Sequence, residues 1–496
     1  MSATRSPPGR WRRPAALQTL LALLAMAAAQ PARAHGFDER YDLPVPLSLV
    51  VGAACAAVAL SFLAAALFAR PVAAGSTQPW GREIAVPRGV LWATRTAAGL
   101  LFVLTVAAAL LGSSDPLMNL APTLVWIVWW VGGAFVAALL CNLWPALDPW
   151  RSAFEALDAL ARRAGRPAGL SLGWRWPAWL GLWPATGLLL AWCWLEVVHP
   201  LASSPLRLGC AALLWTAVNL AGMAAFGRAT WQAQADVFAI VFATLGRLAP
   251  LCLRLPGEAP VPPPPASAGQ AAFVMAMLST VVFDGLHGSA AWNTFEQALR
   301  AAVPAAWLDL NGRFVGTAGL IAVWAGFRLA YRATLGLSLA LLQPAVPARL
   351  LAAQLALTLV PIAAAYNLAH NFSGLFIQGQ TVFQLLSDPF GWQWDLFGTA
   401  RWHPDIGLVD ARLTWNVAVT AIVGGHMAAI WWSHRVVLAA GVPPRRAAWG
   451  LLPLTALMLA YTAVSLLLIA EPMVLPQAAA ADTATTIPPL SLRTPT

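Results

Sequence analysis

The feature that most constrains this chain is a series of long apolar runs separated by short loops that carry arginine. Each run is long enough to cross about 30 Å of hydrocarbon as a helix. Inside a bilayer the backbone must satisfy its own hydrogen bonds, which favours helices over open sheets. The sequence therefore predicts an all-α fold, a polytopic transmembrane helix bundle of about ten spans. The predicted spans are approximately 45–69, 89–112, 122–141, 177–198, 205–226, 270–287, 314–332, 350–377, 412–434 and 447–470.

The composition excludes a water-soluble enzyme. Of the 496 residues, 59% are hydrophobic and only 10% are charged, against about 25% charged residues in ordinary soluble domains. The formal charge of +10 comes from arginines scattered over short loops, a pattern that sets membrane orientation and does not indicate nucleic-acid binding. The partners expected are the lipid bilayer and a lipophilic small molecule. The five cysteines include no C-x-x-C pair, so no disulfide framework is expected.

The N-terminus has the pattern of a secretory signal peptide at residues 1–34. Arg10, Arg12 and Arg13 form a basic region, and an apolar stretch follows at 17–29. The Ala-Arg-Ala sequence at 32–34 is typical of a cleavage site. We therefore expect a mature chain that begins outside the bacterial inner membrane and crosses it several times.

The arginines support this topology. With ten spans, 17 arginines fall in the predicted inner loops and seven in the outer segments, as the excess of positive charge on the cytoplasmic side requires. The predicted organisation has two transmembrane halves of about five spans, the first of which also holds an interfacial helix near 236–253. The segments are the signal peptide 1–34, the first half 35–255, a Pro-rich cytoplasmic linker 256–269, the second half 270–472 with an outer loop 378–411, and an outer tail 473–496.

Ionisable residues gather near the predicted outer ends of the spans. The fourth span ends in Glu196 and His199, and the sixth ends in Asp284 and His287. A spacing of three places a carboxylate and an imidazole on one helix face, which is how helix bundles build metal sites. With His370 of the eighth span, these residues form a candidate site for a divalent metal ion. The alternative is that they are helix-end polar groups that face water.

His426 lies deeper, about 21 Å below the outer start of the ninth span at 1.5 Å per residue. We expect it to hydrogen-bond to a neighbouring helix, and the alternative is that it brackets a haem together with His370. The chain has no Walker loop, no G-x-S-x-G and no H-E-x-x-H motif. A nucleotide-driven pump, an elbow serine hydrolase and a zincin are therefore disfavoured.

Several short stretches resemble one known family over most of the mature chain. They are Ala34-His35-Gly36-Phe37, Arg40 to Leu47, Asn142-Leu143-Trp144, Pro149-Trp150-Arg151, Phe283-Asp284-Gly285, Ala369-His370, Gln378-Gly379-Gln380 and the run from Ser387 to Gly398. The family resembled consists of bacterial polytopic membrane proteins, some of which are named fenitrothion hydrolase.

The resemblance implies hydrolysis of a neutral, lipophilic aryl phosphorothioate ester to a nitrophenol. Metal assistance would require an ion that polarises the ester and lowers the pKa of a bound water. In this hypothesis the carboxylate and histidine residues at the outer ends are the ligands, and Asp284 is essential for catalysis. Asp388 or Asp395, in the outer loop 378–411, acts as a base, and the loop itself is either a substrate-binding lid or a structural cap.

Two further functions are consistent with the sequence. The first is transport of a small solute or metal ion along a pathway lined by Asn219, Asp284, His370, Asn416 and His426. The second is a non-catalytic membrane subunit of a redox or metal assembly. Each hypothesis depends on the same observation, which is that ionisable groups inside a membrane are costly and usually functional.

Overall fold

A computed structural model of the chain describes residues 45–70, 81–199, 203–256, 269–302 and 313–471. It is 77% helical and has almost no strand, which confirms the predicted all-α polytopic bundle. The predicted signal peptide, nearly all of the Pro-rich linker and the predicted tail lie outside the described residues.

The described part of the chain contains nine helical segments long and apolar enough to cross a membrane. Most agree with the predicted spans to within a few residues. The nine are Leu47–Phe68 (α2), Arg88–Leu111 (α3), Leu120–Leu139 (α4, η2, α5), Pro205–Phe226 (α9), Gln270–His287 (α12), Arg313–Leu342 (α15), Ala348–Ser387 (α16, α17, η5, α18), Ala411–Ala439 (α19) and Pro444–Ala470 (α20).

Two apolar helices are shorter. The predicted fourth span begins only at Trp183, because residues 178–182 form turns, and it continues to Val198 as α8 (Trp183–Cys193) and the π-helix η3 (Trp194–Val198). At 1.5 Å per residue it is about 24 Å long, which is less than a full span. The second short helix is Val237–Leu248 (α11 and η4). It corresponds to the segment near 236–253 that was not expected to cross.

The remaining elements are short. Two four-residue strands, β1 and β2, pair in parallel with Arg82 opposite Leu251, a feature that the sequence analysis did not predict. The helix α7 is amphipathic and begins at Pro149, directly after Asp148, whose carboxylate caps it. The bounds are Arg82–Ala85 (β1), Leu251–Arg254 (β2), Pro116–Met118 (η1), Leu120–Pro122 (α4), Thr123–Gly132 (η2), Gly133–Leu139 (α5), Trp144–Leu147 (α6), Pro149–Arg163 (α7), Arg228–Gln234 (α10), Val237–Leu245 (α11), Gly246–Leu248 (η4), Ala290–Ala302 (α13), Ala348–Leu357 (α16), Val360–Ile377 (α17), Gln378–Gln380 (η5), Thr381–Ser387 (α18) and Ile406–Leu408 (η6).

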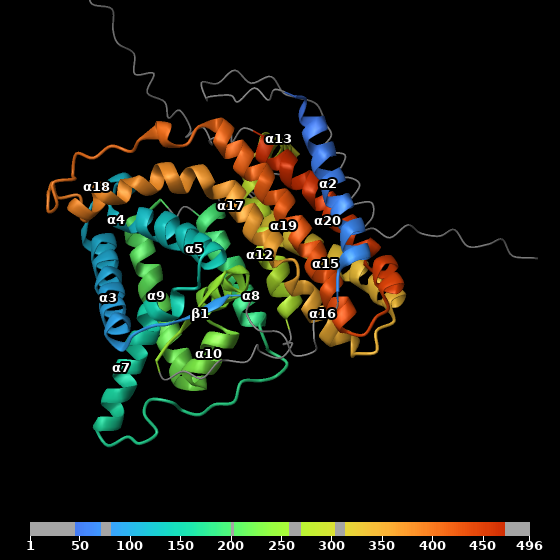
Figure 1. Cartoon of the computed structure of the whole chain (residues 1–496). Helices are drawn as coiled ribbons and strands as arrows, with labels where there is room; N and C mark the ends of the chain where they lie inside the picture. Colours follow the sequence, from blue (N-terminus) through green and yellow to red (C-terminus); the bar gives the residue numbers. More distant parts are fainter. Residues whose placement is uncertain (1–44, 71–80, 200–202, 257–268, 303–312, 472–496) are drawn as a thin grey trace, which may run out of the picture.

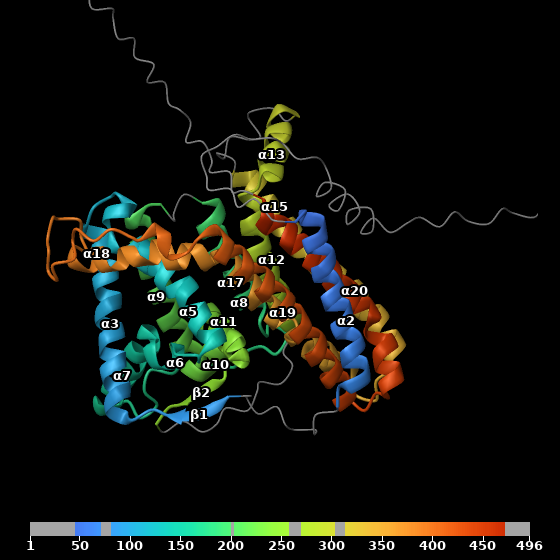
Figure 2. The same cartoon turned by 45° about the horizontal axis from the view of Figure 1, so that its top comes forward.

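The helices from the two halves of the sequence interleave. Figure 2 shows α13 and α18 at one end of the bundle and β1, β2 and α7 at the other. We call these the α18 end and the β1 end. Although α2 is the first helix of the described residues, it packs against α19 and α20. The helix α17 packs against α19 and against η2, which come from opposite halves of the sequence. It continues through η5 into α18 (Figure 1).

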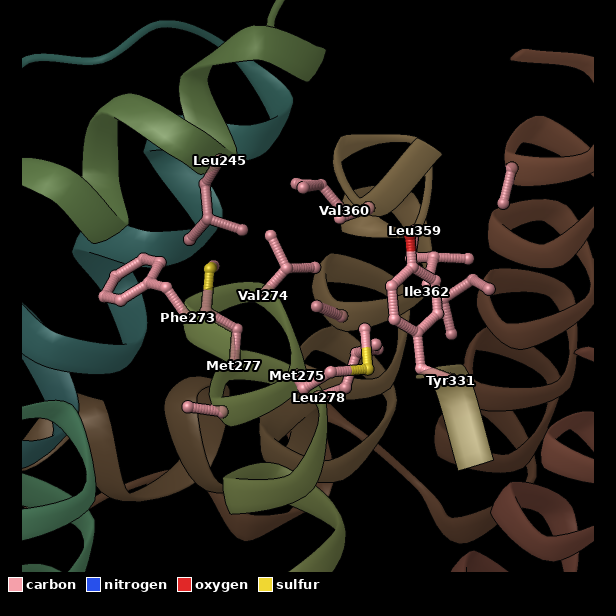
Figure 3. Packing of buried hydrophobic residues seen from close by; sticks show 14 of the residues in the cluster. Leu245, Phe273, Val274, Met275, Met277, Leu278, Tyr331, Leu359, Val360 and Ile362 are labelled. Atoms are coloured by element: carbon pink, nitrogen blue, oxygen red, sulfur yellow. The ribbon is translucent and has the colours of Figure 1, made fainter. Parts of the chain in front are cut away.

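The helix at the centre of the bundle is α12. Two thirds of its apolar window is buried inside the protein, against half or less for the other long helices. Figure 3 shows Phe273, Val274 and Met277 of α12 among residues of α11, α15 and α17. A helix surrounded by other helices needs less lipid-facing surface, which explains why this predicted span has the lowest hydropathy of the group. The packing places the polar end of α12 between neighbouring helices.

Candidate functional site

The centre of the candidate site is a hydrogen bond between two helices. His370 of α17 and Asp284, near the end of α12, are joined by a contact of 2.9 Å between Nε2 and Oδ2. The His370 side chain is 8% exposed and that of Asp284 is 36% exposed. The imidazole is therefore enclosed, while the carboxylate can be reached from outside the protein.

A second carboxylate lies beside this pair. Glu196 belongs to η3, within hydrogen-bonding range of the Trp130 side chain of η2, and it interacts electrostatically with Asp284. The buried Cys193, one turn before Glu196, has its Sγ atom 3.8 Å from the carbonyl oxygen of Thr280, which lies one turn before Asp284. Two carboxylates and one imidazole from three different segments therefore share one region of the bundle. Among the described residues, neither carboxylate forms an ion pair with an arginine.

Tyr366 and Gly285 complete the region, and the sequence analysis did not identify either of them. A Cβ atom on Gly285 would lie 2.8 Å from the Tyr366 hydroxyl and 3.7 Å from His370 Nδ1. The Tyr366 hydroxyl therefore packs directly against the backbone of Gly285, next to Asp284, and leaves no room for a side chain there. Tyr366 is 1% exposed, and its hydroxyl has no hydrogen-bond partner in the part of the chain described.

The other two predicted metal ligands, His199 and His287, pack against aromatic rings. His199 follows the end of η3 in an extended conformation, so the spacing of three no longer places it on the face of Glu196. Its ring packs on Trp194, and burial together with the nearby Arg313 and Arg207 lowers its pKa.

His287 remains on α12, where its ring packs against Phe283 and Trp292 and interacts electrostatically with Asp284. Within the described ranges no group of three or more His, Cys, Asp or Glu side chains could hold a metal ion. The five candidate ligands are therefore not gathered into one such group in the described part of the chain.

The two candidate bases in the outer loop are used to shape that loop. Asp388 accepts hydrogen bonds from the backbone N–H groups of Trp392 and Gln393, at 2.9 and 2.7 Å. Asp395 accepts one from the N–H of Ala400 at 3.0 Å. Both carboxylates thus stabilise turns of their own segment, as aspartate commonly does. These contacts favour a structural cap over a catalytic lid.

The residues expected to line a transport pathway are also dispersed. Asn219 is buried at the junction of α9 and α10, where it bonds Trp231 and Asp236. Asn416 is exposed near the start of α19. His426 bonds the carbonyl of Ile422 on its own helix at 2.8 Å. The expectation that His426 bonds a neighbouring helix is therefore wrong.

A separate pair of buried carboxylates lies toward the β1 end, and the sequence analysis did not identify it. Asp148 caps α7 and accepts a 2.8 Å bond from Gln232. Asp236 caps α11 and is paired with Asn219. Burial raises the pKa of Asp148 to about 6, and burial together with the nearby Asp148 raises that of Asp236 to about 7. Each aspartate directly precedes its helix, a signal that capping rules could have detected.

Comparisons with family models, with curated proteins and with solved structures found no match to this chain. A function for this protein is therefore inferred from the arrangement of Glu196, Asp284 and His370.

Proposed function

We propose that this protein is a proton-coupled transporter of a small solute, located in the bacterial inner membrane with its mature N-terminus outside. The observation that carries the proposal is the hydrogen bond between Asp284 and His370, with Glu196 beside it. Ionisable groups inside transmembrane segments are rare, and chains of Asp, Glu and His are typical of proton relays in pumps and transporters. The nine long apolar helices in the described part of the chain are consistent with a carrier.

The coupling follows from electrostatics. Two carboxylates in a medium of low dielectric repel each other strongly, so they are rarely both ionised unless a cation compensates them. Binding or release of a proton at this group changes its net charge. A solute with a preference for one charge state is then coupled to the proton by its differential affinity for the two states.

The test uses purified protein in liposomes that enclose a pH-sensitive dye. Amines, amino acids, carboxylates and simple cations are added one at a time, with equal pH on both sides. At least one solute should change the internal pH beyond the change seen in protein-free liposomes, and Asp284→Asn should abolish that difference. Asp410→Asn is the matched control, because Asp410 is an exposed cap of α19 and asparagine keeps its capping oxygen. If no solute moves protons through the wild-type protein, the proposal fails.

A second candidate function is hydrolysis of a lipophilic aryl phosphorothioate ester, which the family resemblance implies. The specific observation in its favour is again the pair of Asp284 and His370, because a carboxylate that orients an imidazole is an arrangement suited to a general base. Nitrophenol release from fenitrothion by the purified protein, lost in Asp284→Asn, would support it. Solute-driven proton movement without any nitrophenol release would favour the transporter.

A further inference from the structure

Large apolar side chains gather on the surface of the loop that follows α18. We call residues 388–402 the aromatic loop. The rings of Trp392 and Trp394 pack on each other with their centroids 5.2 Å apart, and both remain exposed. Next to them Leu396 is exposed and Phe397 is 71% exposed. Apolar side chains that gather on a surface in this way usually mark an interaction site.

The backbone of the aromatic loop bonds largely within its own segment. Five of its N–H groups donate to only three side chains, those of Ser387, Asp388 and Asp395. Others donate to carbonyl groups nearby, as the N–H of Leu396 does to Ser387 at 3.1 Å. In water a loop does not need such bonds, because water supplies them. In apolar surroundings the backbone must find its partners within the protein.

The aromatic loop is held against the end of α3. The carbonyl of Phe390 accepts a 2.7 Å hydrogen bond from the N–H of Ser113, and that of Pro389 accepts one of 3.2 Å from Leu120. Figures 1 and 2 show the chain that follows α18 at the edge of the bundle, beside the end of α3. With 24 residues, α3 is about 36 Å long, enough to cross about 30 Å of hydrocarbon. Its end, and the loop bonded to it, therefore lie where the head groups begin.

The surface that leads up to the loop is apolar along its whole length. Leu100, Val103 and Leu111 of α3 are exposed, as is Leu117 of η1, which lies between α3 and the loop. Exposed apolar residues on a helix that spans a membrane contact lipid. The aromatic loop continues this lipid-facing surface to the level at which tryptophan concentrates in membrane proteins.

We propose that the aromatic loop is an interfacial anchor whose partner is the lipid surface at the α18 end, which is the outer leaflet in the proposed orientation. Trp392 and Trp394 lie among the head groups, and Phe397 reaches the boundary with the acyl chains. The exposed charges of Asp395 and Arg401 limit the insertion to this region, because a charge deeper in the hydrocarbon is costly. The anchor goes beyond the transport function and does not depend on which solute is carried.

The experiment measures how deep a fluorophore on the loop lies in the bilayer. Phe397→Cys is labelled with bimane in the full-length protein that also carries Cys210→Ala, because Cys210 is the exposed native cysteine. The labelled Cys210→Ala protein is the blank. The protein is reconstituted into phosphatidylcholine liposomes in which part of the lipid carries a nitroxide quencher, either near the head group or near the end of the acyl chain. Iodide in the buffer is the aqueous quencher.

Two labelled positions serve as matched references. Leu100→Cys lies on the exposed side of α3 near its middle, and Gln297→Cys is exposed on α13, which extends beyond the bundle in Figure 2. We expect the label at Phe397 to lose most fluorescence to the nitroxide near the head group. The label at Leu100 should lose most to the nitroxide at the chain end, and the label at Gln297 to iodide alone.

Two other outcomes would overturn the anchor. A label at Phe397 that responds to iodide as the label at Gln297 does, and to neither nitroxide, would place the loop in water. A label shielded from iodide and from both nitroxides would show that protein covers the loop, as in an association of two copies of this chain. Neither outcome touches the proton-coupled function, which is tested separately by proton movement into liposomes.

Discussion

Two adjacent glycines of α19, the helix that packs against α17, should differ sharply in how well they tolerate a side chain. A Cβ atom on Gly425 would lie 2.5 Å from the Cβ of Ala365 and 2.7 Å from the carbonyl oxygen of Pro361, both on α17. A Cβ atom on Gly424 would meet nothing within 4 Å. Gly425→Ala should therefore destabilise the protein, and Gly424→Ala should not.

The magnitude follows from the overlap. Carbon atoms in contact prefer separations of about 3.5–4.0 Å, so the new methyl group would be about 1 Å too close. Neither Ala365 nor the Pro361 carbonyl can rotate away, and the two helices must separate. Overpacking of this kind typically costs about 1–3 kcal/mol. Both variants gain roughly 0.5–1 kcal/mol of helix propensity, so the difference between them isolates the steric cost.

The assay is unfolding of the purified variants in mixed micelles by titration with SDS, followed by circular dichroism. We expect Gly425→Ala to unfold at a lower SDS fraction than Gly424→Ala, by a difference of about 1–3 kcal/mol in the free energy of unfolding. Equal stability of the two variants would refute the close packing of α17 on α19. Because α17 also carries His370, it would remove support for the placement of the candidate site as well.

Three further predictions concern other parts of the chain. Burial raises the pKa of Asp148 and Asp236 above the ordinary value of 3.8, to about 6 and about 7. The folded state therefore keeps protons that the unfolded state has released, so stability should be lost as pH rises from 3.8 to about 7. The loss is up to about 1.4 kcal/mol per pH unit for each carboxyl. Unfolding titrations at several pH values should show a smaller dependence of stability on pH in Asp236→Asn. Asp388→Ala leaves two backbone N–H groups of the outer loop without their acceptor, so limited proteolysis should cut this loop faster than in Asp388→Asn, and equal rates would contradict the role of the carboxylate. Gly285→Ala would place a methyl group 2.8 Å from the enclosed Tyr366 hydroxyl, so it should lower stability in the SDS titration by roughly 1–3 kcal/mol relative to Gly424→Ala, and equal stability would contradict the packing of Tyr366 on Gly285.

Hydropathy alone predicted most of the fold because each span must bury its own backbone hydrogen bonds in lipid. It failed at the predicted fourth span, where residues 178–182 form turns and shorten the helix that follows. It also missed β1 and β2, since four-residue strands are too short to show a periodic pattern.

Sequence reasoning identified Asp284, His370 and Glu196 as unusual because each is an ionisable group within an apolar segment. The hydrogen bond between Asp284 and His370 depends on how α12 packs against α17, which no spacing along the chain specifies. Tyr366 escaped notice because a tyrosine in an apolar helix is common, and only the neighbouring Gly285 makes its hydroxyl significant.

The two pairs of carboxylates differ in how completely the protein itself satisfies them. Asp148 and Asp236 each accept two backbone N–H bonds at the start of a helix and one side-chain amide bond. Their lone pairs are occupied, and these hydrogen bonds stabilise the starts of α7 and α11.

Glu196 and Asp284 cap no helix in this way. Asp284 is hydrogen-bonded to His370 and interacts with His287, and Glu196 lies within hydrogen-bonding range of the Trp130 indole. Neither carboxylate is occupied by backbone N–H groups in the described part of the chain, so both keep acceptor capacity for a proton or a ligand. The incomplete pair, and not the more deeply buried one, is therefore where solute recognition is expected.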